Sequence, residues 1–280
     1  MIGPPRMRPV EQQTILVTGS TAGLGKELAR ELAQRGATVL VHGRSAERVD
    51  AAITEIAAAS GSDRLYPYVA DLSSLAAVTH LAEEVIAGAT RLDALVNNAG
   101  VGLTERSESA DGHELTFAVN YLAPFLLTTR LLGLLRESVP ARIVNVASIG
   151  QAPVNFSDVM LEHGYDMYAA YSQSKLALIA FSFELAERLR AEGETGVTVN
   201  ALHPATLMPT KLVRETFGRT VDTLEQGVAA TLRLVIDPEL DGVSGVYFNG
   251  LQPAAADGQA YDPSARRRLW ELSERLVQTP

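Results

Sequence analysis

Short apolar runs alternate with longer stretches of helical periodicity along almost the whole chain. Several of the runs are nearly all apolar, which is typical of strands that are covered on both faces in a parallel sheet. The pattern predicts strands at Thr14–Thr18, Thr38–His42, Leu65–Val69, Leu92–Asn97, Arg142–Ala147, Val197–Leu202 and Val243–Phe248.

Between these strands, the spacing of apolar residues predicts helices at Gly23–Arg35, Glu47–Ala59, Leu75–Ala87, Leu115–Leu135 and Tyr171–Ala191. Gly36 suits the end of the first helix, and Ser73 or Ser74 suits the N-cap of the third. A further helix is expected near the C-terminus, where Leu269 and Leu272 recur at helical spacing. Strand–helix alternation from end to end predicts an α/β fold, a doubly wound parallel sheet (Rossmann fold) of about seven strands with helices on both faces.

No linker, repeat or low-complexity segment divides this alternation. We therefore expect residues 14–280 to form a single domain, after a flexible lead-in at residues 1–13 that lacks the apolar region of a secretory signal. Two connections, Ile149–Tyr168 and Pro204–Gly218, are long and show little periodicity. Connections of this length in a compact domain are often lids or pocket walls.

Charge and composition narrow the classes of partner. The chain has 24 Lys and Arg against 33 Asp and Glu, a net charge of −9, which disfavours binding to nucleic acid or to an anionic membrane. The apolar stretch Val119–Leu135 is interrupted by polar residues, and we expect a buried helix rather than a membrane span. Cysteine is absent, and the five histidines lack the spacing of metal ligands, so we expect no metal and a cytoplasmic protein.

A glycine-rich loop lies between the first strand and the first helix. The segment Thr18–Gly25 offers backbone that can approach a pyrophosphate closely, and the N–H groups and the dipole of the following helix favour an anion there. A turn that needs positive φ would look the same, but the strand–loop–helix context favours a dinucleotide site. We expect contacts from Gly19, Ser20, Thr21, Gly23, Leu24 and Gly25.

Tyr171 and Lys175 lie four residues apart near the start of a long predicted helix, so they share one face of it. A phenol with a pKa of about 10 is a poor base at neutral pH. A neighbouring ammonium lowers that pKa, and the tyrosine can then exchange a proton with a carbonyl or alcohol oxygen. Tyr168 has Ser172 at the same offset and gains no such help. By itself the pair is also compatible with an ordinary helix surface.

Ser148 follows the fifth predicted strand, at the edge where open α/β sheets bind ligands. Its hydroxyl can donate to a substrate oxygen, although a serine that caps a turn would give the same pattern.

These features together resemble the short-chain dehydrogenase/reductase superfamily. The resemblance extends from Thr14 to about Val277 and rests on the Gly-x-x-x-Gly-x-Gly spacing of the loop, on Asn97-Asn98-Ala99-Gly100, and on the order of Ser148, Tyr171 and Lys175. It implies that Ser148 orients the substrate, that Tyr171 is the acid or base, and that Lys175 supports Tyr171 and bonds the nicotinamide ribose. It also implies a proton-relay water held by Asn120, which could otherwise be a polar residue inside a helix. The further cofactor contacts that it implies are Asp71, Leu72, Asn98, Ala99, Gly100 and Pro204.

The end of the second strand bears on the choice of cofactor. Gly43 stands where the family's acidic residue would hold the ribose of NAD, and Arg44 follows it. Because arginine makes bidentate, charge-assisted bonds to phosphate, we expect NADP(H), with NAD less favoured. Arg44 could instead be a solvated surface residue, and Ser20, Thr21 and Ala22 include no basic residue such as many NADP-using relatives have.

Within the superfamily the chain is similar to the retinol-dehydrogenase-like branch. The similarity lies in the insertion Ile149–Tyr168, in His203-Pro204, in Gly245–Phe248 and in the tail Arg268–Ser273. Ala205 departs from it, because that branch usually has glycine there. The two long connections suggest a hydrophobic carbonyl or alcohol as substrate, with at most half of their apolar residues lining a pocket: Ile149, Val154, Phe156, Val159, Met160, Leu161, Leu207, Met208, Leu212, Val213 and Phe217.

Three alternatives stay open at this point. One is an NAD-preferring alcohol dehydrogenase of the same fold, which Arg44 argues against. A sugar-nucleotide epimerase also uses a Tyr-x-x-x-Lys pair but usually needs a longer substrate domain than this chain has. A non-catalytic NADP-binding regulatory protein tends to lose catalytic positions, whereas Asn120, Ser148, Tyr171 and Lys175 are all present. The natural substrate, the physiological direction and the oligomeric state, a homo-oligomer included, remain open.

Overall fold

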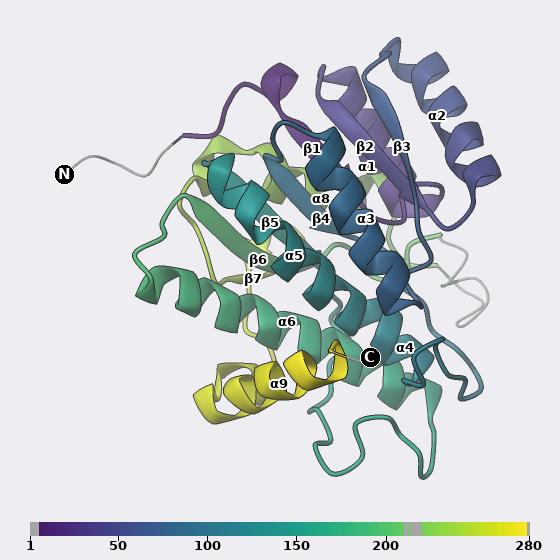
Figure 1. The fold of residues 1–280 in the computed structure, drawn as a ribbon, viewed down its shortest axis with the longest axis vertical. Helices are drawn as coiled ribbons and strands as arrows, with labels where there is room; N and C mark the ends of the chain where they lie inside the picture. Colours follow the sequence, from purple (N-terminus) through teal and green to yellow (C-terminus); the bar gives the residue numbers. More distant parts are fainter. Residues whose placement is uncertain (1–5, 210–212, 214–219, 279–280) are drawn as a thin grey trace.

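The sheet of this protein has its strands in the order β3-β2-β1-β4-β5-β6-β7-β8 (Figure 1). The computed structural model describes residues 6–209, 213 and 220–278. All neighbouring strands pair in parallel except β7 and β8, which are antiparallel. The strands are β1 (Thr14–Val17), β2 (Thr38–Gly43), β3 (Leu65–Val69), β4 (Ala94–Asn97), β5 (Ala141–Val146), β6 (Val197–His203), β7 (Tyr247–Asn249) and β8 (Gln252–Pro253).

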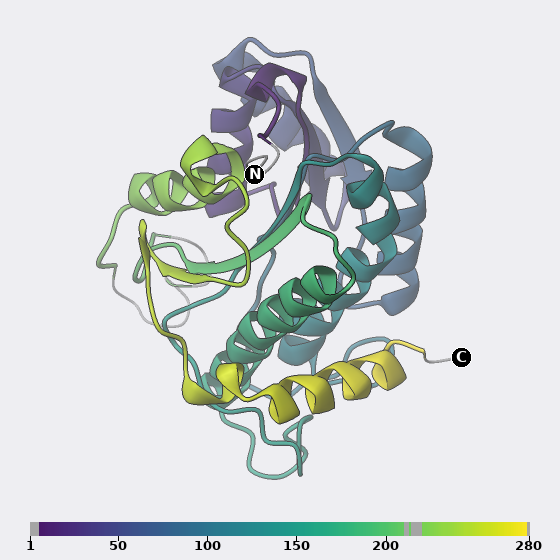
Figure 2. The same ribbon diagram turned by 90° about the vertical axis from the view of Figure 1, so that its left-hand side faces the viewer.

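Helices cover both faces of the sheet, which confirms the predicted doubly wound architecture. One face packs against α1 (Gly23–Gln34), α2 (Ala46–Ser60) and α8 (Leu224–Ile236). The other packs against α3 (Leu75–Gly88), α5 (Ala123–Glu137) and α6 (Met167–Ala191). Outside α6 lies α9 (Pro263–Leu276), which the chain reaches after β8 (Figure 2). The shorter helical pieces are η1 (Val10–Gln12), α4 (Leu115–Phe117), the π-helix η2 (Ala118–Leu122), η3 (Pro238–Leu240) and η4 (Gly258–Tyr261).

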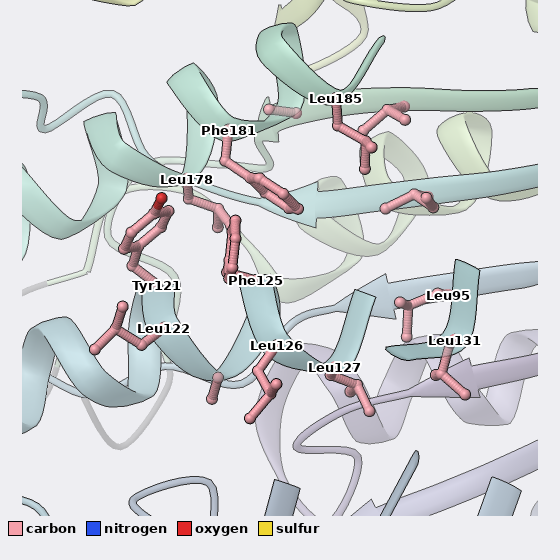
Figure 3. Packing of buried hydrophobic residues seen from close by; sticks show 14 of the residues in the cluster. Leu95, Tyr121, Leu122, Phe125, Leu126, Leu127, Leu131, Leu178, Phe181 and Leu185 are labelled. Atoms are coloured by element: carbon pink, nitrogen blue, oxygen red, sulfur yellow. The ribbon is translucent and has the colours of Figure 1, made fainter. Parts of the chain in front are cut away.

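The core between α5 and α6 is rich in leucine and aromatic side chains. Tyr121, Phe125 and Phe181 meet there in tilted and edge-on contacts, with ring centroids 5.3 to 6.4 Å apart (Figure 3). In the described part of the chain, the run Leu115–Glu137 is the one helical stretch with the length and composition of a membrane span, and 78% of its apolar window is buried inside the fold. A core helix has this same composition, so the feature is weak evidence for a membrane.

Strand order reverses its direction between β1 and β4, because the chain moves outward from β1 to β2 and β3 and then returns to the other side. In open α/β sheets, ligands bind outside the carboxyl ends of the strands at such a switch point. The glycine loop follows β1, and the Asn97–Gly100 segment begins at the end of β4. The topology therefore brings the two sequence motifs to one place.

Two predicted elements are built differently. The strand expected at Val243–Phe248 is reduced to Tyr247–Asn249, because Gly245 has a φ of +77° and Val243 O and Val246 N bond the side chain of Asn200 rather than strand backbone. The helix expected at Leu115–Leu135 is interrupted by the π-helix η2. A π-bulge inside a helix often marks a functional site.

One helix boundary and two additional elements also differ from the sequence expectation. Helix α6 begins at Met167, where the Asp166 side chain accepts a hydrogen bond from Ala169 N, so Tyr171 lies in the second turn and does not open the helix. Helix α8 and strand β8 were not expected. The signal for α8 is the capping box of Thr223 and Gln226, in which each side chain bonds the backbone of the other residue.

The described part of the lead-in, residues 6–13, lies against the body of the protein. It contains η1, Gln13 is buried, and Arg64 donates hydrogen bonds to Glu11 O and Gly36 O. These long-range bonds place the stretch against the domain, and the flexibility expected for the lead-in stays a prediction.

Candidate active site

The glycine loop after β1 has the backbone that its sequence requires. Gly19 and Gly23 adopt positive φ values of +66° and +54°, a region that side-chain-bearing residues rarely enter. At Gly25 a Cβ atom would lie 2.4 Å from Nδ2 of Asn98 and 2.5 Å from the carbonyl oxygen of Gly19. Glycine is therefore needed at all three positions, for conformation at two and for close packing at the third.

Hydrogen bonds from Thr18 and Asn98 hold this loop to the end of β4. The Thr18 hydroxyl accepts from the N–H groups of Asn98 and Ala99, at 2.9 and 3.1 Å. In return, Asn98 Nδ2 donates to the carbonyl oxygens of Thr18 and Gly19. Thr18 was not among the predicted contacts, although its place directly before Gly19 at the strand end is the signal that could have found it.

A second anchor comes from β2. Gly19 N donates to Nδ1 of the buried His42 at 3.1 Å, and burial lowers the pKa of His42 to about 4, which keeps the ring neutral and able to accept. Ser20 is buried as well. Its hydroxyl donates to the carbonyl oxygens of Val17 and His42, and its N–H donates to the carbonyl oxygen of His42. The structure therefore gives Ser20 a role in shaping the loop rather than a hydroxyl free for a ligand.

Helix α1 begins without a side-chain cap. Ala22 stands at the N-cap and offers no side-chain hydrogen bond, and the first turn contains no acidic residue. The first N–H groups of a helix need partners, and together with the helix dipole they favour an anion. Leu24 is buried in the core below the helix start, so its contribution to a ligand site is its main chain. This end of α1 fits a pyrophosphate.

The end of β2 is closed to a side chain. A Cβ atom at Gly43 would lie 2.4 Å from Cγ2 of Thr21 and 3.0 Å from Cγ2 of Val49. Arg44 follows at the surface, and no hydrogen bond or ion pair joins it to any residue of the described ranges. Ser45 then caps α2 by accepting from Arg48 N. An unpaired guanidinium beside a helix N-terminus is suited to a phosphate.

Lys175 and Asn120 are brought together against Gly100. A Cβ atom at Gly100 would lie 3.4 Å from both Asn120 Oδ1 and Lys175 Nζ. Asn120, in the π-helix, donates both amide hydrogens, to Val101 O and Ser174 Oγ, and its Oδ1 accepts from Val101 N, which leaves one acceptor position on that oxygen. Lys175 Nζ is buried and donates to Val146 O at 2.9 Å. Burial lowers the pKa of Lys175 to about 8.

Tyr171 faces Ser148 from the second turn of α6. Burial raises the pKa of the Tyr171 phenol, while a hydrogen bond with the Ser148 side chain lowers it. The ammonium of Lys175 lies 5.6 Å from the centre of the Tyr171 ring. Burial is the largest influence on the pKa of the phenol, and the lowering expected from the ammonium stays a prediction.

Ser148 lies just beyond β5 and is almost fully buried. Its hydroxyl accepts from Gly150 N at 3.1 Å, which leaves its proton free for Tyr171 or for a substrate oxygen. The predicted quartet of Asn120, Ser148, Tyr171 and Lys175 is therefore gathered on adjoining elements, at the same sheet edge as the glycine loop. This arrangement can hold a carbonyl or alcohol oxygen and exchange a proton with it.

Comparison with known proteins agrees with this geometry. The family model for short chain dehydrogenases matches residues 13–219. The chain belongs to the short-chain dehydrogenase family. It is 37% identical to retinol dehydrogenase 13 of Mus musculus, over 98% of this chain and 86% of that protein, and 37% identical to retinol dehydrogenase 14 of the same species, over 95% and 86%. It lies in the retinol-dehydrogenase-like branch, as its sequence indicated.

Solved structures show the same relationship. A protein from Mycobacterium paratuberculosis aligns with a TM-score of 0.79 and 30% identity, over 96% of this chain and 94% of the other. The RhlG/NADP active-site complex of Pseudomonas aeruginosa aligns with a TM-score of 0.69 and 29% identity, over 87% and 97%. As a short-chain dehydrogenase, this chain is an oxidoreductase that acts on alcohol or carbonyl groups and uses a nicotinamide cofactor.

Three further predicted cofactor contacts, Asp71, Leu72 and Pro204, lie outside the glycine loop and the Asn97–Gly100 segment. Asp71 is exposed, and its carboxylate accepts from Ser73 N. Leu72 is buried in the core, so only its main chain is available to a ligand. Pro204 is buried after β6, beside His203, whose Nε2 lies 3.1 Å from Thr206 Oγ1. These three residues lie at the ends of β3 and β6, the correct edge of the sheet.

The apolar residues expected to wall the substrate site divide into groups. Val154, Leu161 and Met208 are buried, whereas Ile149 is 56% exposed beside Ser148. Phe156, Val159 and Met160 pack partly buried against the core. Leu207 is partly buried with a φ of +46°, and Val213 is partly buried. Leu212 and Phe217 lie outside the described residues.

Two further observations concern a metal site and a cavity outside the candidate active site. Among the described residues, no group of three or more His, Cys, Asp or Glu is arranged to hold a metal. A cavity of about 370 Å³ lies between α5 and α9, and its walls include Phe125, Arg130 and Trp270 but none of the site residues.

Proposed function

We propose that this short-chain dehydrogenase is an NADP(H)-dependent enzyme that interconverts a hydrophobic carbonyl compound and its alcohol. The observation that carries the proposal is the gathering of Ser148, Tyr171 and Lys175 beside the glycine loop. The loop, the uncapped start of α1 and the unpaired Arg44 fit the pyrophosphate and the 2′-phosphate of NADP(H).

The choice of NADP(H) over NAD rests on two residues of β2 and its end. Gly43 leaves no carboxylate to bond the ribose hydroxyls of NAD, and Thr21 occupies the space that such a side chain would need. Arg44 offers a charge that is not used elsewhere in the described structure. The RhlG complex with NADP, from a protein of the same fold, supports the assignment.

When bound at the glycine loop, NADPH would supply a hydride for the carbonyl carbon. Ser148 donates a hydrogen bond to the carbonyl oxygen and so orients it toward Tyr171. Tyr171 gives its phenolic proton to that oxygen as negative charge develops there. Because burial keeps the pKa of Tyr171 raised, the phenol is protonated at neutral pH and ready for reduction. In the opposite direction the same group must first lose its proton, so alcohol oxidation is favoured by higher pH.

Lys175 and Asn120 act behind the tyrosine. At neutral pH Lys175 is protonated, since its pKa of about 8 lies above 7, and its charge favours the phenolate formed after proton transfer. We assign to Lys175 a bond to the nicotinamide ribose and to Asn120 the holding of a relay water. The close approach of Asn120 Oδ1 and Lys175 Nζ to Gly100 supports this pairing.

The substrate is proposed to be apolar beyond its reacting group. Exposed Ile149 and partly buried Phe156, Val159 and Met160 belong to the connection that follows Ser148. The similar proteins of the branch are retinol dehydrogenases, which is consistent with an apolar alcohol without establishing a retinoid here.

Turnover of a panel of aldehydes, ketones and alcohols with NADPH, NADH and their oxidised forms tests the proposal. We expect reduction of apolar aldehydes or ketones, with a higher kcat/KM for NADPH than for NADH. Faster turnover with NADH would favour an NAD-preferring alcohol dehydrogenase. Tight binding of NADPH without turnover of any member would favour a regulatory protein.

A further inference from the structure

The main chain of Ser148 is held by two side chains from outside its own strand. Its carbonyl oxygen accepts from the hydroxyl of Tyr247 at 2.9 Å and from Nε2 of Gln151 at 3.1 Å. A carbonyl oxygen has two lone pairs, so both of its acceptor positions are filled. The Ser148 hydroxyl on the other side of the same residue is the group that meets Tyr171.

Both donors are themselves fixed. Tyr247 begins β7 and is buried, and burial raises its pKa to about 12, so the hydroxyl keeps the proton that it donates. Gln151 uses its other amide atom, because Oε1 accepts from Asp257 N at 2.8 Å. Tyr247 therefore ties Ser148 to the sheet, while Gln151 ties it to the C-terminal segment.

The C-terminal segment is bound to the same connection a second time. The side chain of Gln259, in η4, accepts from Val154 N at 2.6 Å and donates to Val154 O at 3.2 Å, as a neighbouring strand would. Helix α9 is anchored in turn to α6, the helix that carries Tyr171, through Arg266 and Glu184 and through Arg188, which stacks 4.1 Å from the Trp270 ring. The C-terminal segment therefore links the connection that follows Ser148 to the helix that carries Tyr171.

We propose that Tyr247 and Gln151 are positioning residues, which fix the main chain of Ser148 so that its hydroxyl stays directed at Tyr171 and the substrate oxygen. Through the bond from Asp257 to Gln151, the segment after β7 belongs to the same device. The inference rests on the proposed carbonyl chemistry at Ser148 and Tyr171. Two bonds on one carbonyl are partly redundant, so the loss of one leaves Ser148 held by the other.

Tyr247→Phe and Gln151→Met each remove one of the two donors at nearly constant size. We expect each single variant to lower kcat about tenfold or less, and the double variant to lower it by clearly more than the product of the two, because neighbouring bonds couple. The affinity for NADPH, measured in the same preparations, should stay within about twofold of the parent. Tyr261→Phe is the matched control, since its hydroxyl accepts from Ala256 N in the same segment without reaching Ser148.

Two readouts separate positioning from general structural support. A loosened Ser148 no longer lowers the pKa of Tyr171, so the rising limb of alcohol oxidation should move to higher pH in the double variant. In a Ser148→Ala background, the same two substitutions should cost kcat almost nothing further, because the group that they direct is gone.

The outcomes distinguish this inference from the proposed function. A parent enzyme that reduces carbonyls, with a double variant of unchanged kcat, overturns the inference and leaves the function standing. Equal losses with and without the Ser148 hydroxyl also overturn it, as does a change confined to the KM of the carbonyl substrate, which would make Gln151 a direct substrate contact. A parent that binds NADPH and turns over no carbonyl or alcohol removes the function and the inference together.

Discussion

Gly43, at the end of β2, faces Thr21 of the glycine loop, and a Cβ atom at Gly43 would lie 2.4 Å from Cγ2 of Thr21. Non-bonded carbon atoms do not approach this closely, so a side chain at residue 43 requires the Thr21 side chain to move. Glycine at residue 43 is therefore required by packing, and it also leaves the end of β2 without a carboxylate.

This contact predicts the behaviour of Gly43→Ala. We expect the substitution to lower the free energy of unfolding by about 1–3 kcal/mol, as overpacking does, and Thr21→Ser to restore part of the loss by removing Cγ2. Urea unfolding of the two single variants and the double variant measures the coupling. Gly133→Ala in α5 is the control, because a Cβ there meets nothing within 4 Å and should be neutral or stabilising. Equal stability of Gly43→Ala and the parent would contradict the clash.

Arg44 is expected to recognise the 2′-phosphate. Arg44→Ala should weaken NADPH binding by about 1–3 kcal/mol, the range for hydrogen bonds to charged groups, and leave NADH nearly unchanged. Dissociation constants for both cofactors decide the matter. Arg267→Ala removes another exposed arginine, on α9, and should change neither constant. Similar losses for NADPH and NADH in Arg44→Ala would mean that Arg44 does not contact the phosphate.

Tyr171→Phe tests the proton donor. The ring and its packing remain while the hydroxyl is lost, so turnover should fall by about two orders of magnitude or more while NADPH still binds. Tyr168→Phe is the matched comparison, since Tyr168 is 56% exposed on the same helix and has no lysine one turn away. Its effect should be mild. Near-normal turnover in Tyr171→Phe would refute the acid–base assignment.

Lys175 predicts a dependence of stability on pH. Burial lowers its pKa from 10.5 to about 8, so between these values the unfolded chain binds more protons than the folded chain and stability rises with pH. Lys175→Met removes this penalty. Without cofactor, the variant should be more stable than the parent by about 1–3 kcal/mol below pH 8, less the lost bond to Val146 O, with the gain fading toward pH 10.5.

Thermal or urea unfolding of the cofactor-free protein across pH 7 to 10 measures this difference. Lys26→Met is the control, because Lys26 pairs with Glu55 at the surface and should show no comparable trend. A gain for Lys175→Met that does not change with pH would show that packing, and not the buried charge, is responsible.

The hydrophobic substrate site predicts a trend along a homologous series. With straight-chain aldehydes of increasing length, kcat/KM should rise until the pocket is filled. The corresponding gain in transition-state binding free energy should be at most about 0.8 kcal/mol per methylene. Steady-state kinetics with NADPH measures the slope. If small polar or phosphorylated carbonyls are the better substrates, the proposed substrate class is wrong although the reaction type stands.

The sequence by itself determined the order of the elements and the family, and it named the candidate reacting groups. Nearly continuous apolar runs predict buried parallel strands, and the glycine spacing with Tyr171 and Lys175 one turn apart predicts the site, because both signals are local. Local patterns fail to predict the details of elements that are shaped by contacts with distant segments. The side chain of Asn120, in the π-helix, bonds Val101, and the shortened β7 follows a segment bonded by Asn200, partners that are distant in sequence.

Only the tertiary structure decided how the site is held and what its groups experience. The raised pKa of Tyr171 comes from burial that the Tyr–Lys spacing does not reveal, and the anchoring of Gly19 by His42 needs β1 and β2 to pair. Tyr247 reaches the carbonyl oxygen of Ser148 across 99 positions of the chain. Desolvation and long-range hydrogen bonds depend on which segments meet in the fold, and that is why the sequence could name the candidate reacting residues but not the residues that we propose position them.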